Sequence, residues 1–226
     1  MAEPARKGLI KAFVGFTGPE LATQEVLYGF VMALIFITSA QVGLISYDSP
    51  WDIIILIVGM NFVWGFIDMY IFYKMDTTAQ KRYSEILRND KQRTEEERYD
   101  EVYDALGSTI FDVLTEEDKT KAAKMLFNGR LGTAKEMKAD RRNMFISAAS
   151  CFVITLLTTI PLILCLVLIP DPNDALPAAT ITACVCLFFV GYMLEPLNGR
   201  WKKTRTGISI ALLAFVLTYF ATYLGG

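Results

Sequence analysis

The chain has 226 residues, 53% of them hydrophobic and 20% charged, and carries a formal net charge of −2 at pH 7. Its charged residues are separated from long uncharged runs, which excludes an ordinary soluble domain. It contains no histidine, so the usual metal ligand and proton shuttle near neutral pH is missing. We predict no nucleic-acid partner and no resident cofactor.

The N-terminal residues 1–25 precede the first long apolar run. Within them, Arg6–Phe16 places basic and apolar residues at helical spacing, which predicts a short interfacial helix on the inner leaflet of a membrane. A plain basic lead-in is the alternative. The first apolar run has the full length of a membrane span, so we predict a retained helix rather than a cleaved signal peptide.

Five apolar runs follow along the chain. A helix needs about 20 residues to cross the roughly 30 Å core of a bilayer. We assign the membrane spans to residues 26–47, 52–74, 143–170, 175–195 and 205–226. Backbone groups in lipid need partners within their own segment, and the runs lack the alternation of barrel strands. The predicted fold is therefore an all-α integral membrane protein with five transmembrane helices, and Pro161 predicts a kink in the third.

The segment 75–142, between the second and third spans, is too charged to enter lipid. Lys74–Arg142 holds 15 acidic and 15 basic residues. Apolar residues nevertheless recur at helical intervals, as in Tyr99, Val102 and Leu106. We predict a helical insertion of about three helices, the first continuing from the second span and the last leading into the third.

The distribution of positive charge predicts the orientation. With five spans, all 22 Lys and Arg residues fall on one side of the membrane, before the first span, in the insertion and in the loop before the last span. Positive charge accumulates on the cytoplasmic side. The prediction is a cytoplasmic N-terminus, a cytoplasmic insertion and an extracytoplasmic C-terminus.

Asp68 is a carboxylate inside the second predicted span. Ionisable groups within a span usually mark an ion pathway, so we predict that Asp68 binds the transported ion. The alternative is a structural carboxylate that reaches the interface or pairs with Lys74 or Arg82. Four more side chains are predicted at similar depth or at the inner mouth of the pathway: Glu25, Tyr28, Met32 and Asn61.

The insertion carries a row of carboxylates at the spacing of one helix face. These residues are Glu97, Asp100, Glu101 and Asp104, with Glu116 and Glu117 at the start of the next predicted helix. Such a face could gather divalent cations through oxygen ligands. Two alternatives stay open: a solvated face balanced by Arg93 and Arg98, and acids that favour the positive end of a helix dipole.

The order of parts, two spans, a charged helical insertion and three spans, resembles the vacuolar iron transporter family. Three segments carry the similarity: Ser147–Leu168 (SAASCFVITLLTTIPLILCLVL), Leu187–Arg200 (LFFVGYMLEPLNGR) and Thr206–Tyr223. The resemblance implies exchange of ferrous iron or manganese for protons, through a pore between the first helices of a homodimer. It matches Asp68 and Glu25 to acidic pore residues of that family. Tyr28-Gly29 and Val63-Trp64 stand where the family has Asp-Gly and Ser-Met.

The function predicted from these observations is transport of a divalent cation, iron-like or manganese-like, coupled to protons. A soft or borderline ion could also use the thioethers of Met32, Met60 or Met69. An ion channel, a transporter of another cation and a non-transporting membrane scaffold are the alternatives. An enzyme is not predicted, because the chain has no histidine, no cysteine in the insertion and no nucleophile motif.

Overall fold

The computed structural model describes residues 18–88, 93–107, 110–129, 131–194 and 199–224, and these residues form helices and connecting turns without any strand. The predicted interfacial helix Arg6–Phe16 lies outside these ranges. The chain divides into two compact units. We call Met1–Ile71 with Ile146–Gly226 the membrane unit, and Phe72–Phe145 the charged unit.

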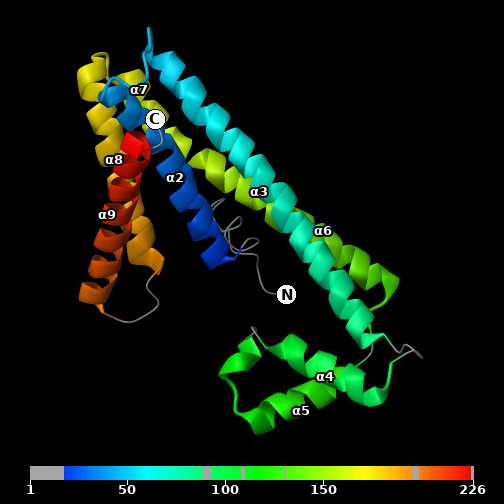
Figure 1. Cartoon of the computed structure of the whole chain (residues 1–226). Coiled ribbons are helices and arrows are strands. Elements are labelled where there is room, and N and C mark those ends of the chain that lie inside the picture. The colour runs from blue at the N-terminus through cyan, green and yellow to red at the C-terminus, as the bar shows by residue number, and fades with distance from the viewer. Residues whose placement is uncertain (1–17, 89–92, 108–109, 130, 195–198, 225–226) are drawn as a thin grey trace, which may run out of the picture. The chain divides into compact units, whose positions relative to one another are not determined.

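The helices follow the order that the sequence predicts (Figure 1). They are α2 (Pro19–Gln41), α3 (Pro50–Leu87), α4 (Glu95–Leu106), the 3₁₀ helix η1 (Ile110–Val113), α5 (Glu116–Phe127), α6 (Ala134–Leu157), α7 (Thr159–Leu168), α8 (Pro172–Leu194) and α9 (Arg200–Leu224). Helices α2, α3, α8, α9 and the consecutive pair α6–α7 supply five segments long and apolar enough to cross a membrane. The five predicted spans are therefore confirmed as helices of sufficient length.

The first span differs from its predicted bounds of 26–47. Helix α2 begins at Pro19, where proline's missing N–H and fixed φ suit a first helical turn. It ends at Gln41 because Gly43 adopts a φ of +77°, and Leu44 N–H then bonds back to the Ser39 carbonyl at 2.9 Å. Glu25 consequently lies inside the first membrane helix rather than before it.

The packing of the membrane unit rests on small residues where helices approach closely. Ala175, Ala179 and Ala183 recur every fourth residue on α8 and are fully buried or nearly so. At the contact between α8 and α9, a Cβ atom on Gly191 would stand 2.9 Å from the Gly207 Cα atom. Small residues of this kind let membrane helices pack backbone to backbone. Figure 1 shows α2 and α9 beside α8.

The third span is broken at Thr158, between α6 and α7. Pro161 has no N–H that could bond to the carbonyl four residues earlier. The break just before this proline confirms the predicted kink. The Thr158 hydroxyl donates to the Thr155 carbonyl at 2.6 Å, and the Thr159 hydroxyl donates to the Leu156 carbonyl at 2.7 Å. Side-chain hydroxyls thus satisfy carbonyls that the break leaves without their regular partners.

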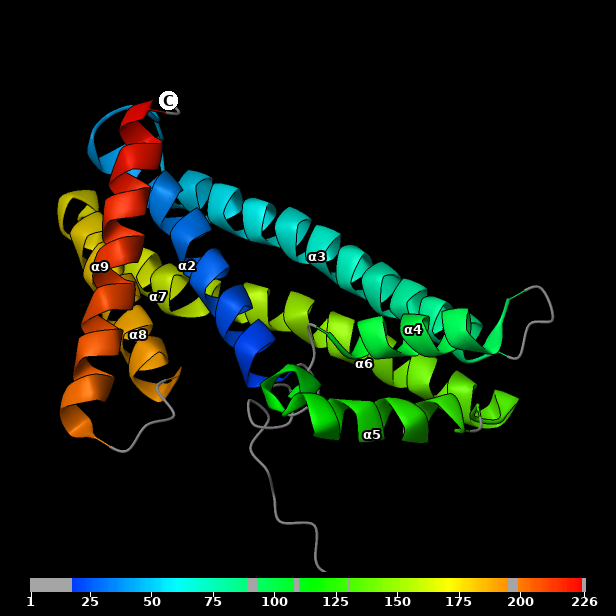
Figure 2. The same cartoon turned by 60° about the horizontal axis from the view of Figure 1, so that its bottom comes forward.

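The charged unit has a small core of its own. Helices α4 and α5 lie side by side (Figure 2) and bury Val102, Leu106 and Ala123. The Tyr99 ring packs edge-on against the Phe127 ring at 5.9 Å between centroids. As predicted, α3 stays helical through Leu87, beyond its apolar part, and α6 begins within the charged segment at Ala134.

Candidate ion site in the membrane unit

Glu25, in the second turn of α2, has no solvent-exposed surface. One oxygen of its carboxylate, Oε2, accepts a hydrogen bond from the Thr155 hydroxyl of α6 at 2.6 Å. The other oxygen, Oε1, is enclosed and has no hydrogen-bond partner among the residues that the structure describes. Removing a carboxylate from water costs several kcal/mol unless it is paired, so such a group is rare without a functional reason.

Two glycines allow the helices to meet around this carboxylate. A Cβ atom on Gly29, one turn after Glu25, would stand 2.3 Å from the Thr158 Oγ1 atom, so α2 passes directly against the break between α6 and α7. On α3, a Cβ atom on Gly65 would stand 3.1 Å from Phe152 Cδ2 and 3.4 Å from Thr155 Cβ. Thr155 therefore lies where α2, α3 and α6 come together.

The polar residues of α3 lie on the same helix face as Gly65. Asn61 and Asp68 stand four residues before and three after that glycine. Asn61 is fully buried and donates from Nδ2 to the Ile57 carbonyl at 2.9 Å, and no described residue bonds to its Oδ1 atom. Asp68 is partly exposed and lies one turn beyond Gly65, the glycine that meets Thr155.

The site thus offers oxygen atoms of three kinds: two carboxylates, a hydroxyl and an amide. Oxygen ligands suit hard divalent cations such as Mg²⁺, Ca²⁺ and Mn²⁺. Over the part of the chain that the structure describes, no three His, Cys, Asp or Glu side chains converge in a group that could hold a metal ion. A cation at this site would therefore need neutral oxygens, water or a second subunit to complete its ligands.

Two of the predicted pathway residues are less buried than Glu25 and Asn61, and one site residue was missed. Tyr28 is 47% exposed, and its hydroxyl accepts from Gln24 Nε2 at 3.3 Å. Met32 is partly buried. Thr155 was not predicted. The run Thr158-Thr159-Ile160-Pro161 did mark this region, because hydroxyls next to a proline indicate a place where helical carbonyls need partners.

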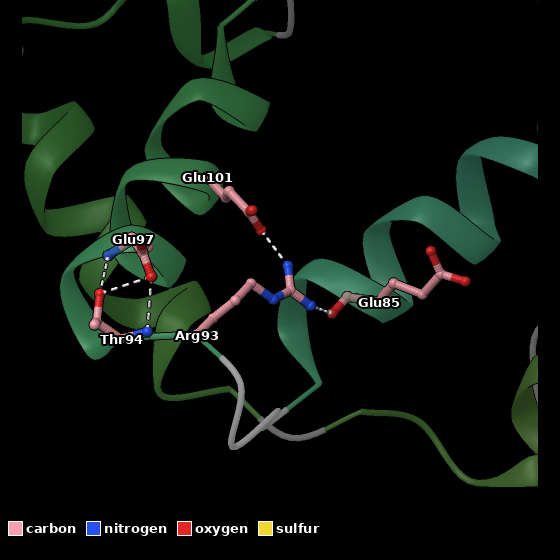
Figure 3. A network of polar contacts seen from close by, with 5 residues as sticks. All are labelled: Glu85, Arg93, Thr94, Glu97 and Glu101. Carbon is pink, nitrogen blue, oxygen red and sulfur yellow. Dashed lines mark hydrogen bonds and ion pairs between the residues drawn. The ribbon is translucent and has the colours of Figure 1, made fainter.

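The predicted metal-gathering face of α4 is largely engaged in local contacts. The Arg93 guanidinium bonds to the Glu101 carboxylate at 2.6 Å and to the Glu85 carbonyl at 3.2 Å (Figure 3). Glu97 accepts from the Thr94 backbone N–H at 2.9 Å, and its own N–H bonds to the Thr94 hydroxyl, which forms a capping box. The hydrogen bond from the Thr94 N–H lowers the pKa of Glu97.

At the start of α5, acidic side chains are paired as well. Glu116 accepts from the Tyr103 hydroxyl and from Lys119 Nζ, the latter at 3.2 Å, and the Tyr103 hydrogen bond lowers the pKa of Glu116. Glu117 pairs with Lys121 at 2.7 Å. These contacts fit the structural alternatives of a capped and balanced surface more closely than a preformed metal site.

The fold places the chain in a class: five helices are long and apolar enough to cross a bilayer, which makes it a multi-pass membrane protein. No protein-family model matches the sequence, and no curated protein or solved structure is significantly similar to it. The likeness to vacuolar iron transporters therefore rests on the quoted segments and the order of the parts.

Proposed function

We propose that this protein transports a divalent cation across the membrane in exchange for protons, and that Glu25 and Asp68 are its ion-binding carboxylates. The observation that carries the proposal is Glu25, a fully buried carboxylate inside a bundle of apolar helices. Within the described part of the chain, one of its oxygens has a hydroxyl partner and the other has none. Ionisable groups in such places belong to ion pathways as a rule.

The charges of the two carboxylates support exchange. When both are ionised, they repel each other. One divalent cation would neutralise both, and so would two protons. Exchange of one for the other leaves the site neutral in each state, which limits the cost of holding charge away from water.

The break between α6 and α7 supports movement at this site. Interrupted helices surround the ion sites of many transporters, where they let one part of the bundle move against another. Here the break touches Gly29 of α2 and lies one turn from Thr155, the residue that binds Glu25. The positive-inside distribution of Lys and Arg supports a cytoplasmic charged unit, whose Asp100 and Asp104 could supply cations to the inner side.

A homodimer would explain the partial exposure of Asp68. A carboxylate within a span is not stable against lipid, so its uncovered side must meet water, a cation or another chain. A second copy of the chain would both cover Asp68 and add ligands to the site. A monomeric mass in detergent, measured by light scattering on transport-competent protein, would contradict this part of the proposal.

Uptake of Mn²⁺ into vesicles that contain the purified protein, with and without a pH gradient, tests the proposal. Glu25→Gln and Asp68→Asn keep the shape of each side chain but remove its charge. We expect each to lower pH-driven uptake at least about tenfold, equal to roughly 1.4 kcal/mol, while Asp68→Glu retains part of it. Asp48→Asn, the same change in an exposed turn, is the matched control.

Each outcome separates the alternatives. Uptake that does not depend on the pH gradient would indicate a channel. If correctly folded protein takes up no divalent cation, the scaffold alternative is indicated. Normal exchange in both Glu25→Gln and Asp68→Asn would show that the carboxylates are structural.

A further inference from the structure

Thr155 is the residue that determines which part of the Glu25 carboxylate is available. Its hydroxyl bonds to Oε2 at 2.6 Å, a distance typical of a short, charge-assisted O–H···O contact. Oε1, the other oxygen of the same carboxylate, is buried and has no partner in the described ranges of the chain. Because Oε2 already shares a lone pair with this hydroxyl and Oε1 shares none with the described residues, Oε1 is the oxygen more available to a cation.

We propose that Thr155 fixes Glu25 as a one-oxygen ligand and thereby makes the site prefer small divalent cations over Ca²⁺. The inference rests on the proposed function, since it concerns the ion that the same site would carry. It assigns selectivity to a residue on α6 that does not itself need to touch the cation. Thr155 is in this sense a positioning residue for Glu25.

The preference follows from how cations use carboxylates. Ca²⁺ takes six to eight oxygens at about 2.3–2.6 Å and commonly binds both oxygens of one carboxylate. Smaller ions such as Mg²⁺ and Mn²⁺ favour octahedral sets of six oxygens, with Mg²⁺ at about 2.0–2.1 Å. A site poor in carboxylates cannot easily give Ca²⁺ its larger shell when one of those carboxylates is limited to one oxygen.

Thr155 is well supported in this role from both sides. Its Cβ atom packs against Gly65 of α3, and its carbonyl oxygen faces Gly29 of α2. The Thr158 hydroxyl bonds to that same carbonyl at 2.6 Å. These contacts leave the side chain little freedom to move away from Glu25.

The hydroxyl also has a second acceptor within reach. Its oxygen lies 3.0 Å from the Cys151 carbonyl, the usual acceptor for a threonine within a helix. A hydroxyl has one hydrogen and can serve one of these acceptors fully at a time. The contact with Glu25 is the shorter of the two and has a charged acceptor, so the hydrogen belongs to the carboxylate.

The test is competition between Mn²⁺ and Ca²⁺ for the purified full-length protein, measured by titration calorimetry. Thr155→Val keeps the branched shape but removes the hydroxyl, so Glu25 can turn both oxygens to a cation. We expect the ratio of Mn²⁺ affinity to Ca²⁺ affinity to fall at least about fivefold. Thr155→Ser restores the hydroxyl and should return the ratio to within about twofold of the wild-type value.

Thr218→Val is the matched control, because it removes a buried threonine hydroxyl of α9 that bonds to the Ala214 carbonyl and has no part in holding Thr155. It should leave the ratio unchanged. If Thr155→Val does not fold, the same titration is made with Thr155→Ala, whose side chain is smaller than that of threonine and also lacks the hydroxyl. The inference is overturned if the ratio of Mn²⁺ affinity to Ca²⁺ affinity is unchanged in the variant without the hydroxyl. It is also overturned if Thr155→Ser lowers this ratio as much as Thr155→Val does. Wild-type protein that binds neither ion overturns the proposed function as well.

Discussion

Glu25 differs from the acidic residues of the charged unit in what surrounds it. Glu97, Glu101, Glu116 and Glu117 lie beside lysine, arginine or a helix N-terminus, whereas Glu25 is enclosed by apolar helices and bound by one hydroxyl. The helices can close around it because Gly29 and Gly65 present no side chain toward α6. The geometry of the carboxylate therefore depends on two residues that carry no functional group.

Gly29→Ala tests this dependence, with Gly59→Ala as the matched control. The added methyl group at Gly29 would collide with Thr158 Oγ1, whereas at Gly59 nothing lies within 4 Å. Overpacking of this kind costs about 1–3 kcal/mol, so we expect Gly29→Ala to lower the thermal unfolding temperature. Gly59→Ala should leave it unchanged or slightly higher. Circular dichroism in detergent measures both, and equal unfolding temperatures would contradict the close contact.

The sequence allowed part of the candidate site to be predicted. Asp68 stood out because it is a charge inside an apolar run, and Asn61 because it shares a helix face with Asp68. Thr155 could not be assigned in this way, since its contact with Glu25 joins residues 130 positions apart. Tyr28 was predicted from depth alone, and depth does not tell which side of a helix faces its neighbours.

At the scale of single elements, α4 shows how acidic residues can serve helix formation. Thr94 and Glu97 close a capping box, and Glu101 pairs with Arg93 in the turn before the helix. The spacing of four carboxylates correctly indicated one helix face. It could not show that Glu101 is paired with Arg93 and Glu97 with Thr94. Both partners precede the helix, and the directions of their side chains depend on the turn.

The stability of α4 should depend on pH through Glu97. Its pKa is held below the ordinary value of 4.5 by the Thr94 N–H, so the charged form favours the folded helix. This stabilisation is complete above pH 4.5 and disappears as the pH falls through the lowered pKa. Hydrogen exchange on the full chain should show α4 protection decreasing in that range. Glu97→Gln should be less protected at pH 7 already.

Glu96→Gln, in the same turn but outside the capping box, is the control and should keep the protection of wild-type protein at pH 7. Asp100→Asn with Asp104→Asn should likewise leave α4 intact. If that pair of changes also leaves Mn²⁺ uptake unchanged, this face has no part in gathering cations. Equal protection in Glu97→Gln and Glu96→Gln would show that the capping box contributes little.

At the scale of the whole molecule, the five apolar helices and the charged helical unit could be predicted from composition and periodicity. Helix ends were less predictable: α2 ends at Gln41, two residues before the left-handed Gly43, although apolar residues continue beyond it. Hydropathy indicates which residues avoid water. A glycine in the left-handed conformation, however, ends a helix whatever the hydropathy of the residues around it. Which helices touch depends on small residues such as Gly191 and Gly207, and no single segment reveals its partner.

The orientation of the spans yields a labelling prediction. In a variant without Cys151, Cys165, Cys184 and Cys186, new cysteines are introduced one at a time by Asp48→Cys, Asp171→Cys and Glu96→Cys. An impermeant thiol reagent applied to intact cells should label the first two and leave the third unlabelled, because the charged unit is expected in the cytoplasm. Labelling of Glu96→Cys from outside, with permeabilised cells as the positive control, would reverse the proposed orientation.

The hydrogen bond between Glu25 and Thr155 also has a consequence for biosynthesis. A ribosome that adds about 5–20 residues per second needs on the order of ten seconds to make the 130 residues between them. Helices α8 and α9, against which α2 packs, are synthesised later still. The newly inserted first span must therefore hold its carboxylate in the membrane, without the hydroxyl that later binds it, until most of the chain has left the ribosome.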